Sequence, residues 1–588
     1  MNFKKILIYN FLLAATIQLH GQSALPPAWN GIHSEQLQRD QRTRVYLPPT
    51  RIVWKEEGGG ASIQGEANLL RPGNGQTDLA NTSICVMKSS VNGHPSLLLD
   101  FGKELQGGLQ LVTGMPGSQK PVNIRIRFGE SVSEAMSTTG IRGATNDHAM
   151  RDFTLSLPWL GVAEVGNTGF RFVRIDLLDP ASELQLKEVR AIFTARDIPY
   201  KGSFSCNDEQ LNKIWLTGAY TVHLNMQEYL WDGIKRDRLV WVGDMHPEVM
   251  TINTVFGYNE VVPKSLDLIR DITPLPQWMN GISSYSIWWL LIHRDWYLYQ
   301  GDLTYLMQQK TYMEGLLKYL LTKVDANGRE KLDGNRFLDW PSSENQPGVD
   351  AGLQALLTMA MDAGSELCRL LKNDSLAAQC AEAAGRMKKQ VPDANHSKQA
   401  AALMALAGLM DPVTADKEVI SVGGAKNFST FYGYYMLQAM GKAQNVQGGL
   451  DIIRTYWGAM LDLGATTFWE DFNMEWLPDA APIDNLVPEG KKDIHGDYGD
   501  YCYKGFRHSL CHGWASGPTS WLTQHVLGFK VLEPGCKVVK IEPSLGDLLW
   551  AEGTLPTPQG TIFVRHEKLS DGSVKTTVKA PKGIRIIK

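Results

Sequence analysis

The chain has 588 residues, of which 43% are hydrophobic, and a formal net charge of −4. This length exceeds that of one compact domain, so we expect two to four domains. The balance of 58 basic and 62 acidic residues leaves no large basic field, which argues against a nucleic-acid partner. The 17 tryptophans favour a surface for flat, partly apolar ligands such as sugars, although core packing alone could use many of them.

The N-terminus has the pattern of an export signal. Residues 1–5 carry two lysines, residues 6–17 are mostly apolar, and Gly21 lies near a plausible cleavage point. The apolar run is too short to span a membrane, and no other stretch approaches 18 apolar residues. We therefore predict a signal peptide over residues 1–21, no membrane span, and an exported protein that is periplasmic or extracellular.

The seven cysteines show no CxxC pair and no Cys/His spacing typical of a zinc site. An odd number leaves at least one free thiol. A disulfide between Cys502 and Cys511 and buried free thiols both remain open.

Residues 22–200 are expected to form an antiparallel β-sandwich. Val122, Ile124, Ile126 and Phe128 alternate with polar residues, which is the period of a half-buried strand. Similar short runs are separated by glycine-containing breaks, as in antiparallel sheets. No carboxylate pair stands out here, so we assign this domain to support or carbohydrate contact.

Helical periodicity begins near residue 204, and residues 201–530 are predicted to be one helical domain. Asn207 or Asp208 can cap a helix that starts at Glu209, because its side-chain oxygen accepts a free backbone N–H. Residues 351–371 and 374–391 are predicted to form a pair of helices. The segment has room for roughly twelve helices of average length, which suits a ring of paired helices.

Residues 531–588 are expected to form a small C-terminal β domain. Two strand-like runs, residues 561–565 and 574–578, flank Asp571-Gly572, a strong hairpin signal.

Two segments of the helical domain contain residues suited to chemistry. Residues 231–248 place four acidic residues around Arg236, Arg238 and Trp241: Asp232, Asp237, Asp244 and Glu248. Residues 464–473 place Glu470 beside Trp469. Because the two segments are far apart along the chain, only a closed fold would bring them together.

Hydrolysis of a glycosidic bond needs two carboxyl groups, one to protonate the leaving oxygen and one to activate water or attack. Crowding by Asp232 and Asp244 would favour the protonated form of Asp237, whereas Arg236 and Arg238 would oppose it. The faces of Trp241 and Trp469 suit stacking on a sugar. These residues alone indicate a carbohydrate-active protein, and a solvated ion network with core tryptophans remains the alternative.

Residues 232–244, DGIKRDRLVWVGD, resemble the signature of glycoside hydrolase family 78, the α-L-rhamnosidases. Three further stretches resemble later elements of that family: GATTFWE at 464–470, SLCHGW at 509–514 and LDW at 338–340. Residues 99–102 and 169–173 fit the β domain that precedes the catalytic domain there. The resemblance covers nearly the whole chain after the signal.

The resemblance implies an (α/α)6 barrel between β-sandwich domains, inversion of configuration and no metal in the chemistry. The general acid falls on Asp237 and the general base on Glu470. The implied sugar-binding positions are Asp232, Arg236, Trp241, Asp244 and His512, with Trp340 and Trp289 by looser matching and Trp469 from its position beside the base.

The sequence departs from the family pattern within the first motif. Gly233, Ile234 and Lys235 stand where the family has Cys-Pro-Gln. The acid is Asp237 where the family has Glu, which is one methylene longer. A displacement of about 1 Å can lower a rate about 100-fold, so the change leaves three outcomes open: a compensating backbone, a displaced substrate or lost activity.

A loop before the His512 stretch interleaves basic and aromatic side chains: Lys491, Lys492, Lys504, Arg507, His508, Tyr498, Tyr501 and Tyr503. Cations that face the site would hold a carboxylate or sulfate on a neighbouring sugar. A solvated loop balanced by Asp493, Asp497 and Asp500 is the alternative.

The leading prediction is an exo-acting, inverting α-L-rhamnosidase that acts on an oligosaccharide or polysaccharide. One alternative is a hydrolase or lyase on the same barrel that acts on another sugar, for example an acidic one. A second is a glycan-binding protein that lost catalysis. GxGxxG, P-loop, HExxH and EF-hand patterns are missing from the sequence, so we expect no cofactor and no metal.

Overall fold

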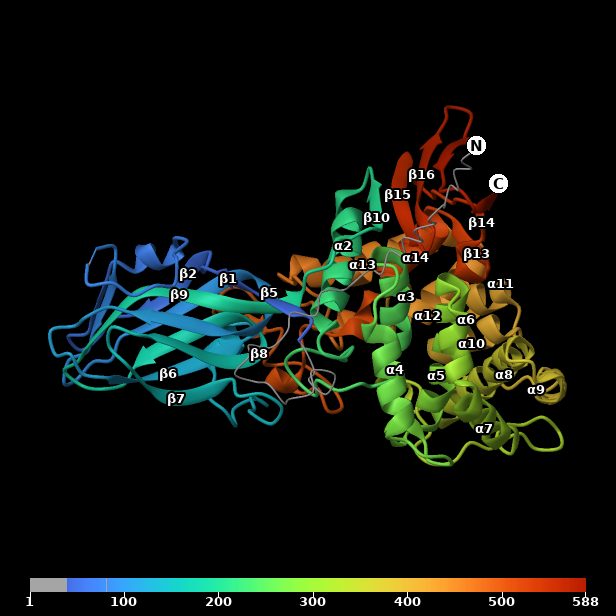
Figure 1. Ribbon diagram of the computed structural model, residues 1–588, viewed down its shortest axis with the longest axis horizontal. Helices are drawn as coiled ribbons and strands as arrows, with labels where there is room; N and C mark the ends of the chain where they lie inside the picture. Colours follow the sequence, from blue (N-terminus) through green and yellow to red (C-terminus); the bar gives the residue numbers. More distant parts are fainter. Residues whose placement is uncertain (1–39, 81) are drawn as a thin grey trace, which may run out of the picture. The chain divides into compact units, whose positions relative to one another are not determined.

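The computed structural model describes residues 40–80 and 82–588. The N-terminal part of the fold is a nine-stranded antiparallel sheet (Figure 1). The predicted signal peptide lies outside the described residues. The strands are β1 (Arg42–Leu47), β2 (Arg51–Glu56), β3 (Ser62–Gln64), β4 (Cys85–Lys88), β5 (Ser96–Thr113), β6 (Val122–Gly129), β7 (Asp152–Leu157), β8 (Val162–Leu177) and β9 (Glu183–Arg196). The main path runs β3-β4-β9-β5-β8-β6-β7, with β1 on β9 and β2 on β5.

The sheet follows the expected alternation. In β6, Val122, Ile124, Ile126 and Phe128 are all buried. They join one hydrophobic core with residues of β5, β8 and β9, the longest strands. The prediction of antiparallel strands in this part of the chain is confirmed, because every pairing in this sheet is antiparallel. A short helix, α1 (Val132–Met136), follows β6.

Helices dominate the next part of the chain. They are α2 (Glu209–Asn225), α3 (Met245–Val255), α4 (Val261–Asp271), α5 (Ser283–Gln300), α6 (Leu303–Gln308), α7 (Lys310–Leu321), α8 (Gln346–Leu370), α9 (Asp374–Met387), α10 (Lys398–Ala407), α11 (Pro412–Ala415), α12 (Gly433–Lys442), α13 (Val446–Asp462) and α14 (Gly517–Trp521). Asp208 caps α2 as predicted, since its side chain accepts from the backbone N–H groups of Gln210 and Leu211 at 2.9 and 3.2 Å. The expected helix pair corresponds to α8 and α9.

The C-terminal part contains two small sheets. β15 (Trp550–Thr557), β16 (Gly560–Lys568) and β17 (Val574–Lys579) form antiparallel ladders, with the predicted hairpin between β16 and β17. β13 (Phe529–Glu533), β14 (Val538–Ile541) and β18 (Arg585–Ile587) form the other sheet. One strand was not expected: β10 (Ser203–Cys206), just before α2, pairs with β15.

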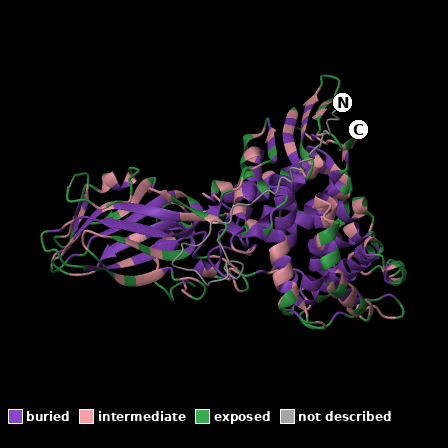
Figure 2. Ribbon diagram, viewed as in Figure 1, coloured by how far each residue is buried: buried purple, intermediate pink, exposed green. Residues whose placement is uncertain are grey.

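Buried polar contacts join the nine-stranded sheet to the helices, and Arg42–Lys588 form one compact unit. Arg171 of β8 pairs with Asp100 at 2.9 Å and donates to the Gly464 carbonyl at 3.0 Å. Tyr220 of α2 donates to the Glu104 carbonyl at 2.6 Å. Figure 2 shows buried residues along the long strands and through most of the helices, with exposed residues mainly in loops.

Two smaller findings bear on the expectations above. Within the described residues, no helix is both long and apolar enough to cross a membrane. All seven cysteines fall in this part of the chain, and each has a free thiol, Cys502 and Cys511 included.

Candidate active site

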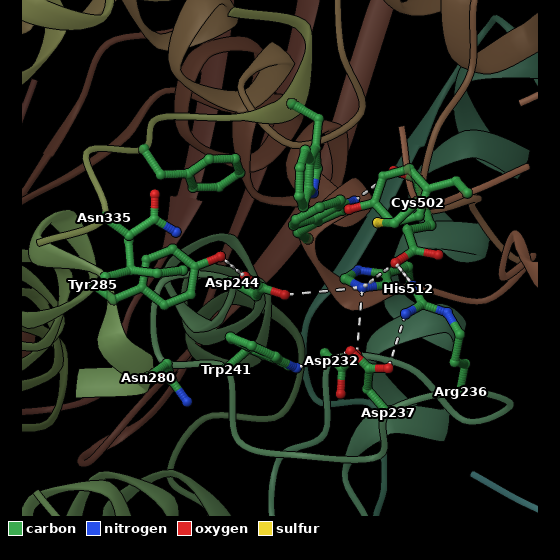
Figure 3. A pocket seen from close by; sticks show the side chains of 16 residues that line it. Asp232, Arg236, Asp237, Trp241, Asp244, Asn280, Tyr285, Asn335, Cys502 and His512 are labelled. Atoms are coloured by element: carbon green, nitrogen blue, oxygen red, sulfur yellow. Dashed lines mark hydrogen bonds and ion pairs between the residues drawn. The ribbon is translucent and has the colours of Figure 1, made fainter. Parts of the chain in front are cut away.

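A cavity of about 270 Å³ opens among the loops at the ends of the helices (Figure 3). Its walls are formed by Asp232, Arg236, Asp237, Trp241, Asp244, Asn280, Ile282, Tyr285, Asn335, Phe337, Trp340, Glu470, Cys502, Tyr503, His512 and Trp514. The fold therefore brings together the two acidic segments that the sequence separates. Both predicted catalytic carboxyl groups, Asp237 and Glu470, line the cavity.

The loop that carries Asp237, residues 232–239, has an unusual backbone. Asp237 and Arg238 are consecutive left-handed residues, with φ of 54° and 59°. Each such residue costs on the order of 1 kcal/mol or more and persists only where its surroundings enforce it. The loop is closed at its base, because Leu239 N donates to Asp232 Oδ1 at 2.9 Å and Asp232 N donates to the Leu239 carbonyl at 3.1 Å.

The same loop rests on the nine-stranded sheet. Gly169 N of β8 donates to the Ile234 carbonyl at 3.0 Å. A Cβ at position 169 would lie 2.6 Å from Ile234 Cγ1 and 2.9 Å from Lys235 N, so only glycine permits this approach. Arg238 points away from the cavity and donates to the Asn167 carbonyl at 2.8 Å. The sheet thus helps to hold the acid loop in its strained form.

Two side chains donate hydrogen bonds to the Asp237 carboxyl group. Arg236 Nη1 donates to Oδ1 at 2.8 Å, and Trp241 Nε1 donates to Oδ2 at 3.1 Å. Both contacts are visible in Figure 3. Trp241 therefore orients the predicted acid, in addition to lining the cavity.

Glu470 is held from inside the helical domain. Its Oε1 accepts from Arg236 Nη2, and its Oε2 accepts from Ser509 N at 3.1 Å. Its carbonyl accepts from Thr430 Oγ1 at 2.6 Å and from Trp514 Nε1 at 2.8 Å. These contacts fix both the backbone and the carboxyl group of the predicted base.

Arg236 joins the two predicted catalytic carboxyl groups, because its two terminal nitrogens bind Asp237 and Glu470 separately. Burial opposes the charge of this guanidinium, yet its pKa is raised by Glu470 and Asp237. It therefore stays cationic and sets the spacing of the pair.

Two other carboxyl groups are driven towards the neutral form. Burial raises the pKa of Asp232 well above its usual value, and the charges of Asp237 and Asp244 add to the effect. Burial also raises the pKa of Asp244, against a 2.7 Å hydrogen bond from Tyr285 Oη. Neutral carboxyl groups both donate and accept hydrogen bonds, which suits the hydroxyl groups of a sugar.

His512 lies between these groups. Its Nε2 is 3.5 Å from Glu470 Oε1, 3.7 Å from Asp232 Oδ2 and 3.9 Å from Asp244 Oδ2. Burial lowers the pKa of His512 well below its usual value, so the ring is neutral at pH 7. It can direct one N–H to this cluster or to a bound hydroxyl group.

Aromatic rings form the opposite wall of the cavity. Trp340 stacks on Tyr501 with 5.9 Å between ring centroids and packs edge-on against Phe337 at 5.2 Å. Tyr503 contacts Trp340 at 6.0 Å. Such a wall suits the C–H face or the methyl group of a 6-deoxy sugar.

Several wall residues were missed from the sequence: Asn280, Ile282, Tyr285, Asn335, Phe337, Cys502, Tyr503 and Trp514. Trp514 ends the SLCHGW stretch, and Asn335 and Phe337 directly precede the LDW stretch, so motif position gave some signal. Tyr285 and Asn280 lie near the start of α5 with no local motif.

Two predicted sugar-stacking residues do not line the cavity. Trp289 is fully buried in α5, where its Nε1 donates to the Leu266 carbonyl at 3.1 Å. Trp469 is 1% exposed and packs edge-on against Phe472 at 5.7 Å. Both rings are covered by neighbouring core residues, so neither offers a face to a sugar in this structure.

The basic side chains of residues 491–507 do not face the cavity either. Arg507 pairs with Asp147, and Lys491 lies 3.5 Å from Asp479. Lys492 lies over the Tyr498 ring, and Lys504 is exposed. The surface expected for a sulfate or carboxylate is therefore not formed. Of this loop, Tyr503 lines the cavity and Tyr501 supports Trp340.

A buried acidic cluster lies beneath the acid loop. Ligand atoms of Glu130, Glu134 and His495 fall within 4.8 Å of one another, a spacing that suits a metal ion. The Lys235 ammonium group, however, is 3.0 Å from Glu130 Oε2 and 3.4 Å from Glu134 Oε1. The lysine thus supplies the positive charge that a metal would bring.

Known proteins resemble the chain in both sequence and fold. Residues 199–411 match the family described as the bacterial alpha-L-rhamnosidase 6 hairpin glycosidase domain. An alpha-L-rhamnosidase from Alteromonas sp. (strain LOR) is 25% identical, over 82% of this chain and 55% of the relative. The chain thus spans about half the length of that relative.

Solved structures support the fold. The GH78 family rhamnosidase of Bacillus sp. GL1 superposes with a TM-score of 0.73 at 22% identity, over 89% of this chain and 55% of that one. The rhamnosidase from Klebsiella oxytoca, solved with rhamnose bound, gives a TM-score of 0.63 at 19% identity, over 82% of this chain and 95% of that one. At these identities the likeness shows the fold alone.

The helical domain carries an acidic and aromatic cavity at its loop ends. Residues 199–411 within it match the bacterial alpha-L-rhamnosidase 6 hairpin glycosidase domain. Sequence and fold together make the chain similar to the bacterial α-L-rhamnosidases.

Proposed function

We propose that the protein is an exo-acting α-L-rhamnosidase that inverts configuration at the anomeric carbon. The single observation that carries the proposal is the cavity in which Arg236 holds Asp237 and Glu470 apart, beside an aromatic wall. A cavity of about 270 Å³ suits one terminal sugar rather than a continuous chain. The fold that we infer for this activity is an (α/α)6 barrel flanked by β-sandwich domains.

The two carboxyl groups take complementary parts in this mechanism. Protonated Asp237 donates its proton to the glycosidic oxygen as the bond to the anomeric carbon breaks and its electron pair moves to that oxygen. Ionised Glu470 takes a proton from the water that attacks the same carbon from the opposite side. Neutral Asp232, Asp244 and His512 bind the sugar hydroxyl groups during these steps.

The aromatic wall gives the proposal its sugar preference. L-Rhamnose carries a methyl group where most hexoses carry a hydroxymethyl group, and Trp340 and Phe337 offer an apolar contact for it. An acidic sugar has less support, because Arg236, the one cation on the cavity wall, already binds both Asp237 and Glu470. From the pattern of residues 1–21 we further infer that the protein is exported.

Turnover tests the proposal directly. An aryl α-L-rhamnoside and a natural rhamnose-terminated disaccharide are assayed with the wild type, Asp237→Asn, Glu470→Gln and the surface control Glu475→Gln. We expect wild-type hydrolysis of both substrates and a loss of at least about 1000-fold on the disaccharide in the two cavity variants. The control, whose side chain is 63% exposed in a pair with Lys426, should match the wild type.

Two outcomes would contradict the proposal. Hydrolysis of another glycoside in preference to rhamnosides would show that the enzyme acts on a different sugar. Binding of rhamnose-terminated glycans without any turnover would make the protein a lectin-like relative that lost catalysis.

A further inference from the structure

A loop from the nine-stranded sheet enters the active site beside the predicted acid. Residues 137–151 connect α1 to β7. Within this loop, His148 Nε2 lies 3.3 Å from Asp237 Oδ1. The family signature does not include this histidine, since it lies in the β domain, far from the catalytic motifs in the sequence.

The tip of this loop is docked on residues 497–507 by specific contacts. Asp147 pairs with Arg507, and Phe506 N donates to the Arg142 carbonyl at 2.7 Å. Gly143 has φ of +79°, and a Cβ there would lie 2.5 Å from the Lys504 carbonyl oxygen. A glycine is therefore required for this close approach. These contacts hold His148 beside Asp237.

The base of the loop is equally well fixed. Arg151 is 2% exposed and donates to the Phe128 carbonyl at 2.9 Å. The Asn146 side chain accepts from Arg151 N at 3.0 Å and donates to the Asp152 carbonyl at 2.8 Å. A side chain on a loop tied at both ends keeps its distance to a partner, as a proton-transfer group must.

The surroundings of Asp237 explain why a partner is needed. A general acid has to carry a proton at the start of every turnover. Arg236 and Trp241 donate hydrogen bonds to the two carboxyl oxygens of Asp237. A group that contacts Asp237 and exchanges with water can supply this proton.

His148 meets both conditions. Its side chain is 29% exposed, so water reaches it, and its Nε2 approaches Asp237. Asp147 Oδ2 is 3.5 Å from the same nitrogen, and Asp147 also pairs with Arg507. Arg236 Nη1 binds the same oxygen of Asp237 at 2.8 Å. His148 Nε2 thus lies between the carboxyl groups of Asp147 and Asp237.

We propose that His148 is a proton-relay residue that acts through Asp237. The protonated Nε2 transfers its proton to Asp237 Oδ1, and Asp237 passes a proton to the glycosidic oxygen as the bond breaks. Neutral His148 then regains a proton from water. The nine-stranded sheet thereby supplies part of the acid machinery. This inference rests on the proposed function.

The test separates proton supply from binding. His148→Ala is compared with the wild type on the disaccharide, whose leaving group needs protonation, and on a 2,4-dinitrophenyl rhamnoside, whose leaving group does not. His94→Ala, an exposed histidine in the loop before β5, is the matched control. We expect kcat on the disaccharide to fall about 10- to 100-fold in His148→Ala, with little change on the aryl substrate or in KM. Added imidazole should restore part of the loss.

Equal losses on both substrates, a change in KM alone or no loss would overturn the relay and leave the loop as a wall of the site. Wild-type turnover tests the proposed function, whereas the ratio of variant to wild type tests the relay. If the wild type hydrolyses neither rhamnoside, the contact between His148 and Asp237 is tested by NMR. Asp237→Asn should then move the ¹⁵N resonance of His148 Nε2, and an unchanged resonance would overturn the pairing.

Discussion

The two carboxyl groups of the cavity are held in contrasting ways. The Glu470 side chain is 3% exposed, and groups of the helical domain, Thr430, Ser509 and Trp514, fix its carboxyl group and backbone. The Asp237 side chain is 17% exposed and projects from a left-handed turn. The predicted base is thus part of the interior, whereas the predicted acid lies where the helices meet the nine-stranded sheet.

This difference shows that the helical domain alone does not complete the site. The acid loop is contacted from the sheet side by Gly169 under Ile234, and by Glu130 and Glu134 around Lys235. Substitution of Glu470 should therefore lower catalytic activity and leave the fold unchanged. Changes at the contact with the sheet should alter stability and the placement of the acid together.

The largest effect is expected at the base. Glu470→Gln should lower kcat by at least about 1000-fold on both the aryl rhamnoside and the disaccharide, because activation of water does not depend on the leaving group. Asp237→Asn should show the large loss only on the disaccharide. Steady-state kinetics with both substrates check this pattern. A Glu470→Gln variant within about 10-fold of the wild type would exclude Glu470 as the base.

A large loss of stability is expected at the contact with the sheet. Lys235→Met leaves Glu130 without its cation and Glu134 with Arg151 alone, and breaking a buried pair typically costs about 3–5 kcal/mol of unfolding free energy. Lys55→Met, which breaks exposed pairs with Glu57 and Glu66, should cost far less. Chemical denaturation of both variants measures the difference. Equal small losses would mean that the buried cluster does not depend on Lys235.

A pH-dependent effect is expected beside the base. Burial raises the pKa of Asp471 to about 7. Because the folded state holds this proton more tightly than the unfolded state, Asp471 costs stability as the pH rises from about 4 to about 7, and the cost is constant above that window. The unfolding free energy that Asp471→Asn gains over the wild type should therefore be about 2 kcal/mol larger at pH 8 than at pH 5. A difference that does not vary with pH would contradict the raised pKa.

The smallest effect tests the packing under the acid loop. The Cβ of Gly169→Ala would press on Ile234 and Lys235, so we expect a loss of about 10-fold in kcat on the disaccharide. Gly117→Ala, in the turn between β5 and β6, has no atom within 4 Å of the new Cβ and should behave as the wild type. Unchanged kinetics in Gly169→Ala would show that the sheet does not position the acid.

Local pattern and motif order accounted for part of the architecture. The strand of Val122 to Phe128, the Asp208 cap and the hairpin at Asp571-Gly572 follow from periodicity and turn chemistry, which act over a few residues. β10 was assigned to the helical domain because its partner, β15, lies more than 300 residues later. Pairing over such a distance leaves no local signal.

The site was predictable where residues lie in motifs and unpredictable where partners come from elsewhere. Asp232 to Asp244, Glu470 and His512 line one cavity as the motif order implies. Trp289 and Trp469 fit a sugar-stacking pattern equally well, but burial is a property of the whole fold. Tyr285, which binds Asp244, and His148, which approaches Asp237, come from segments without any motif.

The stereochemistry of the first product tests the unequal parts of the two carboxyl groups most directly. ¹H NMR during hydrolysis of an α-L-rhamnoside records which anomer of rhamnose appears before mutarotation. With Asp237 as acid on one side and a Glu470-activated water on the other, β-L-rhamnose should appear first. The α anomer as first product would require a carboxyl group to act as nucleophile, and would contradict the assignment of Glu470 as a base.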